Sequence, residues 1–213
     1  MEGSHSGAFP GMRLIDRMAW PLRYLQPYVD GGKRVLDAGC KESPYFHTDE
    51  RGFNLKWRPG QVVSVDLDAW AHPDMVQADI CHLPFSDRAF DLVLCTEVYE
   101  HLTRPEDAVR ELARVCRGII VGTTPNHSLY TDDQLGHLRE HSDEWPRPWF
   151  DYKILRAVPE DVMPHYAHIQ WVTEAGLRRN LETAGGKVFI EPCKGPHYET
   201  WKGSYYFGFV VKL

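Results

Sequence analysis

Two short apolar segments that each end in an aspartate constrain this chain most. The first, KRVLDAGC, reads as a buried strand that breaks into a turn at Gly39. The second, QVVSVDLD, reads as a buried strand with Asp66 at its tip. A glycine permits a tight turn and close approach of the backbone to a ligand. A carboxylate at the strand tip beside such a turn can accept both hydroxyls of a ribose, so the two segments predict a ligand that carries an adenosine-type sugar.

Strand-like and helical segments alternate through the rest of the chain. The amphipathic stretch after Pro105 predicts a helix that Gly118 stops, and a second helix is predicted from Thr173, its N-cap, to Ala184, with Gly185 and Gly186 as its stop. Further apolar segments predict strands at residues 75–78, 90–95, 119–122, 187–191 and 205–211. This alternation predicts an α/β protein with a parallel sheet covered on both faces, in which the last two strands form an antiparallel hairpin.

The N-terminal region is expected to be helical after an unstructured start. Residues 1–11 read as a disordered leader or a cloning remnant, and residues 12–213 as a single domain. Apolar residues at helical spacing occur between Met12 and Tyr28, and Pro21 and Pro27 interrupt them. We therefore expect two short helices, which either cover the ligand site as a lid or pack across the sheet edge.

Composition and charge exclude several classes of protein. The net charge is −6 and no basic run exceeds two residues, which argues against broad binding of nucleic acids but leaves a local patch open. Five cysteines without a C-x-x-C motif indicate reduced thiols in a cytoplasmic protein. No apolar run approaches the roughly 18 residues of a membrane span. We expect a small-molecule acceptor, no membrane association, and a monomer or homodimer.

Residues 34–126 resemble a class I S-adenosylmethionine-dependent methyltransferase. RVLDAGCKESPYF is similar to the family's first motif, and VVSVDLD to its ribose-binding second strand. The segment ADICHLPFSDRAFDLVLCTEVYEHLTRPEDAVRELARVCRGIIVGTTPN resembles the central signature, and HIQWVTEAGLRRNLETAGGKV the return helix. The resemblance implies S-adenosyl-L-methionine as the cofactor. It also implies a Rossmann-like fold with a seven-stranded, mostly parallel sheet, an antiparallel last strand and helices on both faces.

The resemblance also implies roles for single residues. The methionine end of the cofactor would be contacted by Asp37, Gly39 and Cys40. Asp66 would bind the ribose and Leu67 would flank the adenine. Asp79 would bind the adenine amine and Ile80 would pack against the adenine ring, although Asp79 can also be interpreted as a turn cap. Thr96 would lie near the transferred methyl group. One residue departs from the family pattern, because Lys41 stands where the turn usually has its second glycine.

The expected reaction is methyl transfer to an oxygen or nitrogen atom of a small-molecule or sugar-like acceptor. Such a nucleophile is helped by a general base, and histidine titrates in the suitable range. The candidates are His101, His127 and His137, each of which also has a purely structural reading. An irregular segment at about residues 124–169, rich in aromatic residues and histidine, is expected to form the acceptor pocket.

No metal is expected for the reaction described above. Two alternatives to it stay open. In the first, E-x-x-E-H places Glu97, Glu100 and His101 on one face of a helical turn, where His141 or His137 can complete a Mg²⁺ or Mn²⁺ site. This motif resembles the metal site of small-RNA 2′-O-methyltransferases. In the second, Lys41 impairs the cofactor turn and leaves an inactive binding module. An oxidoreductase is disfavoured because G-x-G-x-x-G is missing.

Overall fold

The computed structural model describes residues 15–41, 45–46, 55–68, 75–127, 172–194 and 205–213. The helices are α1 (Leu22–Asp30), α2 (Pro105–Val115) and α5 (Glu174–Leu181), with 3₁₀ turns η1 (Tyr99–His101) and η5 (Glu182–Ala184). The strands are β1 (Val35–Ala38), β2 (Val62–Asp66), β3 (Met75–Gln77), β4 (Phe90–Thr96), β5 (Cys116–Pro125), β6 (Lys187–Lys194) and β7 (Tyr205–Lys212). Several predictions fall outside these ranges: the leader at 1–11, His137, His141 and most of the segment at 124–169.

One sheet of seven strands organises the described residues, in the order β3-β2-β1-β4-β5-β7-β6. Strands β1 to β5 pair in parallel, and β7 is antiparallel to both of its neighbours, β5 and β6. The predicted fold class and the terminal hairpin are therefore confirmed. Because β1 lies next to β4, the strand order reverses between them, and in open α/β sheets ligands bind at the carboxyl ends of the strands at such a point.

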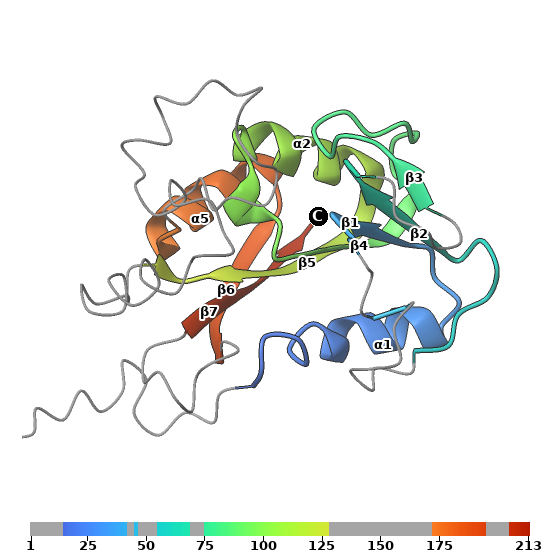
Figure 1. Ribbon diagram of the computed structural model, residues 1–213, viewed down its shortest axis with the longest axis horizontal. Helices are drawn as coiled ribbons and strands as arrows, with labels where there is room; N and C mark the ends of the chain where they lie inside the picture. The colour runs from blue at the N-terminus through green and yellow to red at the C-terminus, as the bar shows by residue number, and fades with distance from the viewer. Residues whose placement is uncertain (1–14, 42–44, 47–54, 69–74, 128–171, 195–204) are drawn as a thin grey trace, which may run out of the picture.

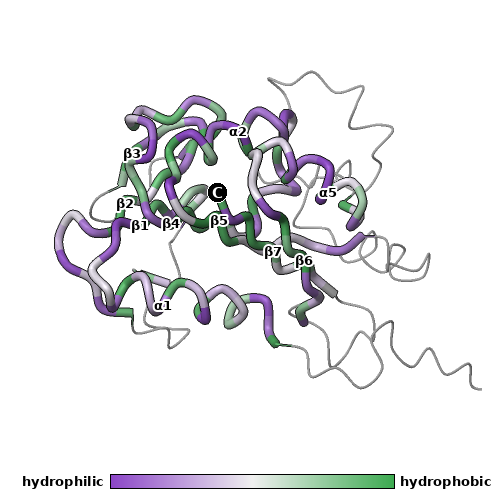
Figure 2. Tube along the Cα trace, turned by 180° about the vertical axis from the view of Figure 1, so that it is seen from behind, coloured by the Kyte–Doolittle hydropathy of each residue, from purple (hydrophilic) through white to green (hydrophobic). Residues whose placement is uncertain are grey.

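Helices lie on both faces of the sheet, α1 on one and α2 with α5 on the other (Figure 1). Successive residues of each central strand point to opposite faces of the sheet. The core beneath α2 and α5 contains Leu36, Val93 and Ile120. The core beneath α1 contains Val35, Leu92 and Val121. Hydrophobic residues are concentrated along the central strands in Figure 2. Burial on both faces explains why these strands read as continuous apolar runs.

The predicted starts and stops of the two later helices are largely confirmed. Pro105 occupies the first turn of α2, and the Thr173 hydroxyl caps α5 by accepting from the Gly176 N–H at 3.2 Å. Gly185 ends η5 with φ +76°, the left-handed conformation that favours glycine. The stop at Gly118 is wrong, because α2 ends at Val115. Gly118 lies in β5, where a Cβ would sit 2.2 Å from the Asp91 carbonyl oxygen.

The prediction of two short N-terminal helices is also wrong. Between residues 15 and 30, which the structure describes, one helix, α1, continues through Pro27, and Pro21 sits at its N-cap. A proline inside a helix removes one backbone hydrogen bond. Here Leu25 and Val29 on either side of it are buried against the sheet, and that packing offsets the loss.

The described cysteines are all free, as expected, and four of the five are buried. Within the part of the chain that the structure describes, no helix is long and apolar enough to cross a membrane.

Candidate functional site

The turn after β1 is fixed to the tip of β2 by backbone hydrogen bonds. The N–H groups of Gly39 and Cys40 both donate to the Val65 carbonyl, at 2.8 and 2.9 Å. Gly39 has φ +71°, and a Cβ there would come within 2.3 Å of a Val98 methyl carbon. Glycine is therefore required for two independent reasons, backbone conformation and space. Burial, with Asp37 and Asp66 nearby, raises the pKa of Cys40, so this thiol stays protonated at neutral pH.

Asp66 joins the tip of β2 to the turn after β1. Its Oδ2 accepts from the Lys41 N–H at 2.8 Å and its Oδ1 from the Asp68 N–H at 3.1 Å. A carboxylate offers about four lone-pair positions, so capacity remains for two hydroxyl donors. Leu67, the next residue, has 46% of its surface exposed although it is apolar. This arrangement suits a ribose beside a flat apolar ring.

Lys41 is the one residue of the turn that departs from the family pattern. Its φ is +45°, so the lysine adopts a left-handed backbone, which glycine adopts more readily. Its contact with Asp66 is made by the backbone N–H, which any residue except proline supplies. The lysine therefore keeps the backbone contact with Asp66, at the cost of some backbone strain.

Replacing Lys41 with glycine is expected to stabilise the protein by about 0.5 kcal/mol. Relief of a left-handed backbone contributes about 1–2 kcal/mol, and the greater freedom of glycine in the unfolded chain costs about 0.4–1 kcal/mol. Affinity for S-adenosylhomocysteine should stay within about twofold, since the backbone N–H is kept. Urea unfolding and calorimetry measure the two quantities.

Arg88→Gly is the matched control, because Arg88 is the other exposed cation with a left-handed backbone, at φ +58°, and its N–H donates to Arg114. It should give a similar gain in stability with no change in affinity. A large loss of affinity in Lys41→Gly alone would show instead that the lysine side chain holds the ligand.

Asp79 and Ile80 follow β3 and approach the same edge of the sheet as Asp66, which pairs with Gln77 in register. The Asp79 Oδ1 accepts from the Cys81 N–H at 2.8 Å, as a turn cap does, and its Oδ2 lies 3.6 Å from His82 Nδ1. Ile80 is buried in the core beneath α2. The turn-cap interpretation of Asp79 is therefore confirmed, and its contact with the adenine amine stays a prediction.

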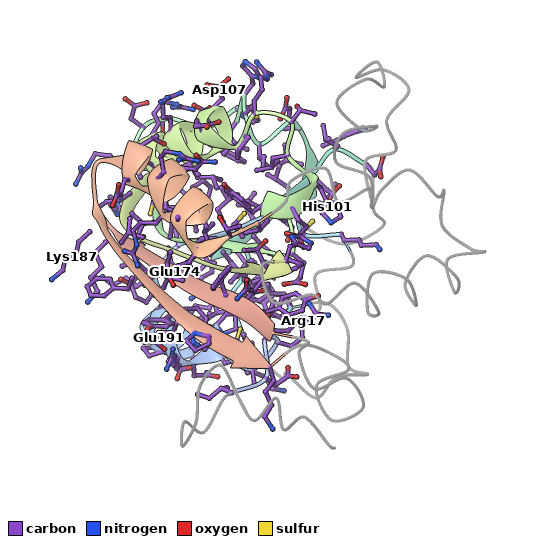
Figure 3. The ribbon with its side chains drawn as sticks, turned by 90° about the vertical axis from the view of Figure 1, so that its left-hand side faces the viewer. Arg17, His101, Asp107, Glu174, Lys187 and Glu191 are labelled. Carbon is purple, nitrogen blue, oxygen red and sulfur yellow. The ribbon has the colours of Figure 1, made fainter. Side chains whose placement is uncertain are left out.

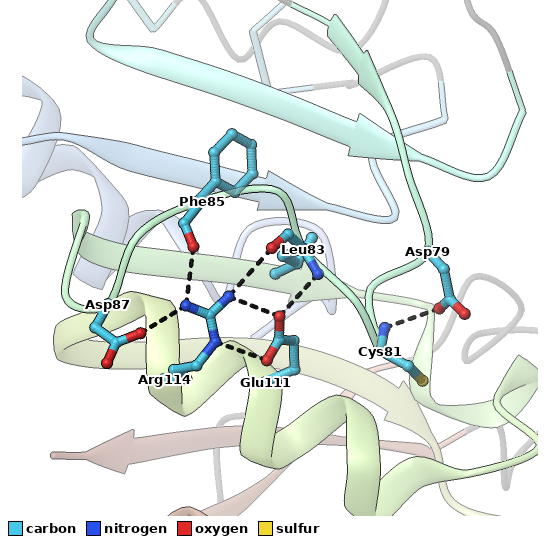
Figure 4. A network of polar contacts seen from close by, with 7 residues as sticks. All are labelled: Asp79, Cys81, Leu83, Phe85, Asp87, Glu111 and Arg114. Atoms are coloured by element: carbon cyan, nitrogen blue, oxygen red, sulfur yellow. Dashed lines mark hydrogen bonds and ion pairs between the residues drawn. The ribbon is translucent and has the colours of Figure 1, made fainter.

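Arg114 on α2 clamps the loop that follows Asp79 (Figure 4). Its guanidinium donates to the carbonyls of Leu83 and Phe85 at 3.1 and 2.8 Å, and to Asp87 at 2.7 Å. Glu111 bonds the same guanidinium and accepts from the Leu83 N–H at 2.8 Å. Hydrogen bonds to charged groups are among the strongest in proteins, so this clamp fixes the loop that follows β3.

A buried polar cluster lies where β1 and β4 end. Asp37 is 2% exposed on β1, and Tyr45, from the segment after the turn, is 1% exposed. Burial raises the pKa of Tyr45, and the nearby carboxylates of Glu97 and Asp37 raise it further, while the Thr96 hydroxyl acts in the opposite direction. The tyrosine is therefore a neutral hydroxyl group between the tips of the two strands.

Glu97, just past β4, has the left-handed φ of +57° that is rare for residues other than glycine. Its N–H donates to the Thr123 carbonyl at 2.8 Å, and its Oε1 accepts from the Thr123 hydroxyl at 2.8 Å. Burial, with Glu100 nearby, raises the pKa of Glu97 to about 8. Residues held in such strained conformations cluster at functional sites, and this one lies at the strand-order reversal.

The helical turn proposed for E-x-x-E-H does not include Glu97. The 3₁₀ turn begins only at Tyr99, and the left-handed backbone of Glu97 directs the chain differently. Glu100 is 1% exposed and accepts from the Thr124 hydroxyl at 3.0 Å, and burial raises its pKa to about 7. Among the described residues, no three His, Cys, Asp or Glu side chains are arranged to hold a metal ion.

The two described candidate bases have different surroundings. His127 is buried, and its Nδ1 accepts from the Val172 N–H at 2.9 Å, so in the neutral ring the proton is on Nε2. Burial, with His101 nearby, lowers the pKa of His127 to about 4. His101 is less enclosed, with 22% of its side chain exposed and its Nε2 4.0 Å from Glu100 Oε1.

Arg17 is a site residue that the sequence reasoning missed. Its guanidinium forms an ion pair with Glu97 at 2.5 Å and lies 4.9 Å from the centre of the Tyr206 ring. Figure 3 shows Arg17 and His101 on the same side of the molecule. A contact between residues 80 positions apart leaves no local pattern in the sequence.

The domain matches a known family over its central part. Residues 36–119 match the family model described as a methyltransferase domain. A probable S-adenosylmethionine-dependent methyltransferase of Mycobacterium tuberculosis is 34% identical over 108 residues, 46% of this chain and 37% of that protein. A putative methyltransferase of Encephalitozoon cuniculi is 33% identical over 110 residues, 47% of this chain and 49% of that protein. The matched regions thus span less than half the length of either relative.

Solved structures share the architecture of nearly the whole chain. An S-adenosylmethionine-dependent methyltransferase from Mesorhizobium loti superposes with a TM-score of 0.57 at 16% identity, covering 92% of this chain and 97% of that one. One from Archaeoglobus fulgidus has a TM-score of 0.55 at 19% identity, covering 92% and 93%. The fold is therefore shared with these S-adenosylmethionine-dependent methyltransferases.

Proposed function

We propose that this protein transfers a methyl group from S-adenosylmethionine to an oxygen or nitrogen atom of a small-molecule or sugar-like acceptor. The observation that carries the proposal is the meeting of three strand ends at one edge of the sheet. Gly39 after β1, Asp66 on β2 and Thr96 on β4 occupy neighbouring strands at the point where the strand order reverses. In open α/β sheets, ligands typically bind at such a point.

The described residues suit the parts of this cofactor. Asp66 retains acceptor capacity for the ribose hydroxyls, and the exposed Leu67 offers an apolar surface to the adenine. The turn at Gly39 brings backbone close to the tip of β4, where Thr96 and Glu97 lie. The bound cofactor supplies an activated methyl group on a sulfonium, so the protein has to align the acceptor and exclude water.

Of the two described candidate bases, His101 and His127, the contacts favour His101 as the base that takes the proton of the acceptor. The Nδ1 of His127 is occupied by a backbone N–H, and its low pKa makes it a weak proton acceptor at neutral pH. His101 lies on η1 beside the end of β4, is partly exposed, and has a carboxylate neighbour in Glu100. That carboxylate, where ionised, would stabilise the imidazolium formed on proton transfer.

The test is transfer of a labelled methyl group to sugars, small phenols and short RNAs, with and without Mg²⁺. We expect a metal-independent product with one of the small-molecule classes. His101→Gln should lower the transfer rate by about 100-fold or more, with affinity for S-adenosylhomocysteine unchanged, because general bases contribute in this range. Product that forms only with RNA and Mg²⁺ would instead support the metal-assisted alternative. Absence of any S-adenosylhomocysteine binding would support an inactive module.

A further inference from the structure

The segment before α1 is tied to the end of β6. We call residues 15–20 the N-terminal strap. The Arg17 N–H donates to the Lys194 carbonyl and the Lys194 N–H to the Ile15 carbonyl, both at 2.8 Å. Lys194 is the last residue of β6 and pairs with Tyr205 at the start of the antiparallel β7. The strap therefore lies at the edge where the parallel strands have their carboxyl ends.

Trp20 fixes the other end of the strap. Its ring is 2% exposed and packs so closely on β7 that a Cβ on Gly208 would approach it to 2.4 Å. Its indole N–H donates to Glu191 on β6 at 3.3 Å, and Arg23 pairs with the same carboxylate. With both ends anchored to β6 and β7, the strap has little freedom to move away from the sheet edge.

Arg17 extends from this anchored strap to the tip of β4. Its side chain is 18% exposed and that of Glu97 is 24% exposed, so the ion pair is largely shielded from water. The guanidinium also lies over the Tyr206 ring, which limits its alternative orientations. Removing one partner of such a shielded contact is costly, because the other buried polar group is left without the partner that compensates its burial.

Glu97 is one of the residues of the site with a left-handed backbone, and the contacts that hold it come from Thr123 and Arg17. Thr123 supplies one hydrogen bond to the backbone N–H and one to Oε1, while Arg17 holds Oε2. A left-handed residue other than glycine persists only where its surroundings impose it. Arg17 is the one cation in this set of contacts, and its charge favours the ionised form of Glu97, which burial and the nearby Glu100 disfavour.

We propose that Arg17 is a positioning residue. Through its ion pair with Glu97, it holds the turn after β4 in the shape that binds the cofactor, and so makes the N-terminal strap part of the methyl-transfer site. This inference rests on the proposed function. It extends the site beyond residues 36–119, the region that matches the methyltransferase family.

The test compares S-adenosylhomocysteine affinity by calorimetry in wild type, Arg17→Gln, Glu97→Gln and the double variant. We expect Arg17→Gln to weaken binding by about tenfold. Because Arg17 acts through Glu97, the double variant should bind no more weakly than Glu97→Gln alone. Arg17→Lys should recover most of the affinity, since it restores the charge. Circular dichroism establishes that each variant is folded at the temperature of measurement.

Arg23→Gln is the matched control, because it removes an exposed ion pair of the same region, with Glu191, that does not involve Glu97. The side chains of that pair are 37% and 45% exposed, and exposed pairs contribute little. Its affinity should equal that of wild type. Wild-type affinity in Arg17→Gln, or losses that multiply in the double variant, would overturn the role of Arg17 alone. A wild-type protein that binds no S-adenosylhomocysteine would overturn the proposed function, and this inference with it.

Discussion

Asp66→Asn is expected to weaken binding of S-adenosylhomocysteine by about 100-fold. Two ribose hydroxyls donating to an ionised carboxylate form charge-assisted bonds, each worth about 1.5–3 kcal/mol, and an amide offers one acceptor oxygen in place of two. A loss near 2.7 kcal/mol corresponds to a factor of about 100. The substitution also places an NH₂ group opposite the backbone N–H of Lys41 or of Asp68. Calorimetric titration of the folded variant measures the change.

Asp68→Asn is the control for this prediction. It changes the same type of residue two positions later and removes the same charge, but the contact of Asp68 with Asp66 is made by its backbone N–H. Affinity in this variant should stay close to that of wild type. Equal losses in the two variants would mean that general negative charge, and not the β2 tip, attracts the ligand.

Gly39→Ala is expected to be the most disruptive single change in the turn. A left-handed alanine costs about 1–2 kcal/mol, and an extra carbon forced against Val98 costs about 1–3 kcal/mol. A total of about 2–5 kcal/mol is a large part of the stability of an ordinary domain. Urea unfolding should show this loss, and cofactor binding should be severely weakened because the turn must shift away from β4.

The second variant, Gly39→Ala with Val98→Ala, separates the two causes. Removing the Val98 methyl groups eliminates the approaches at 2.3 and 2.9 Å and leaves one of 3.2 Å to the Val98 Cβ. The double variant should therefore be destabilised by less than the sum of the two single variants, with the backbone cost remaining. Strictly additive losses would indicate that the alanine at position 39 does not meet Val98.

Much of the fold could be predicted because burial and local chemistry agree along the chain. The apolar runs around Leu36 and Val93 are strands buried on both faces, and the Thr173 cap and the Pro105 start follow from helix-end chemistry. The prediction failed where long-range packing overrides local rules. Pro27 is accommodated inside α1 by burial of its neighbours, and Gly118 is required by the nearby Asp91 carbonyl, not by the end of a helix.

The candidate site could be predicted only where its residues lie at strand tips. Asp37, Gly39 and Asp66 follow apolar runs, so their meeting at one edge follows from a parallel sheet. The backbone of Lys41 and of Glu97 could not be foreseen, because left-handed conformations at residues other than glycine depend on tertiary contacts. Arg17 could not be foreseen either, since only the folded chain brings it to Glu97.

The central claim is that the tips of neighbouring strands form one adenosyl site, and photolabelling tests it most directly. The protein would be irradiated with an 8-azidoadenosyl analogue of S-adenosylhomocysteine, digested, and mapped by mass spectrometry. We predict label on the peptides that contain Asp66 and Leu67 or Asp79 and Ile80, and loss of that label when unmodified S-adenosylhomocysteine competes. Label confined to other peptides, or label that the competitor does not displace, would contradict the account.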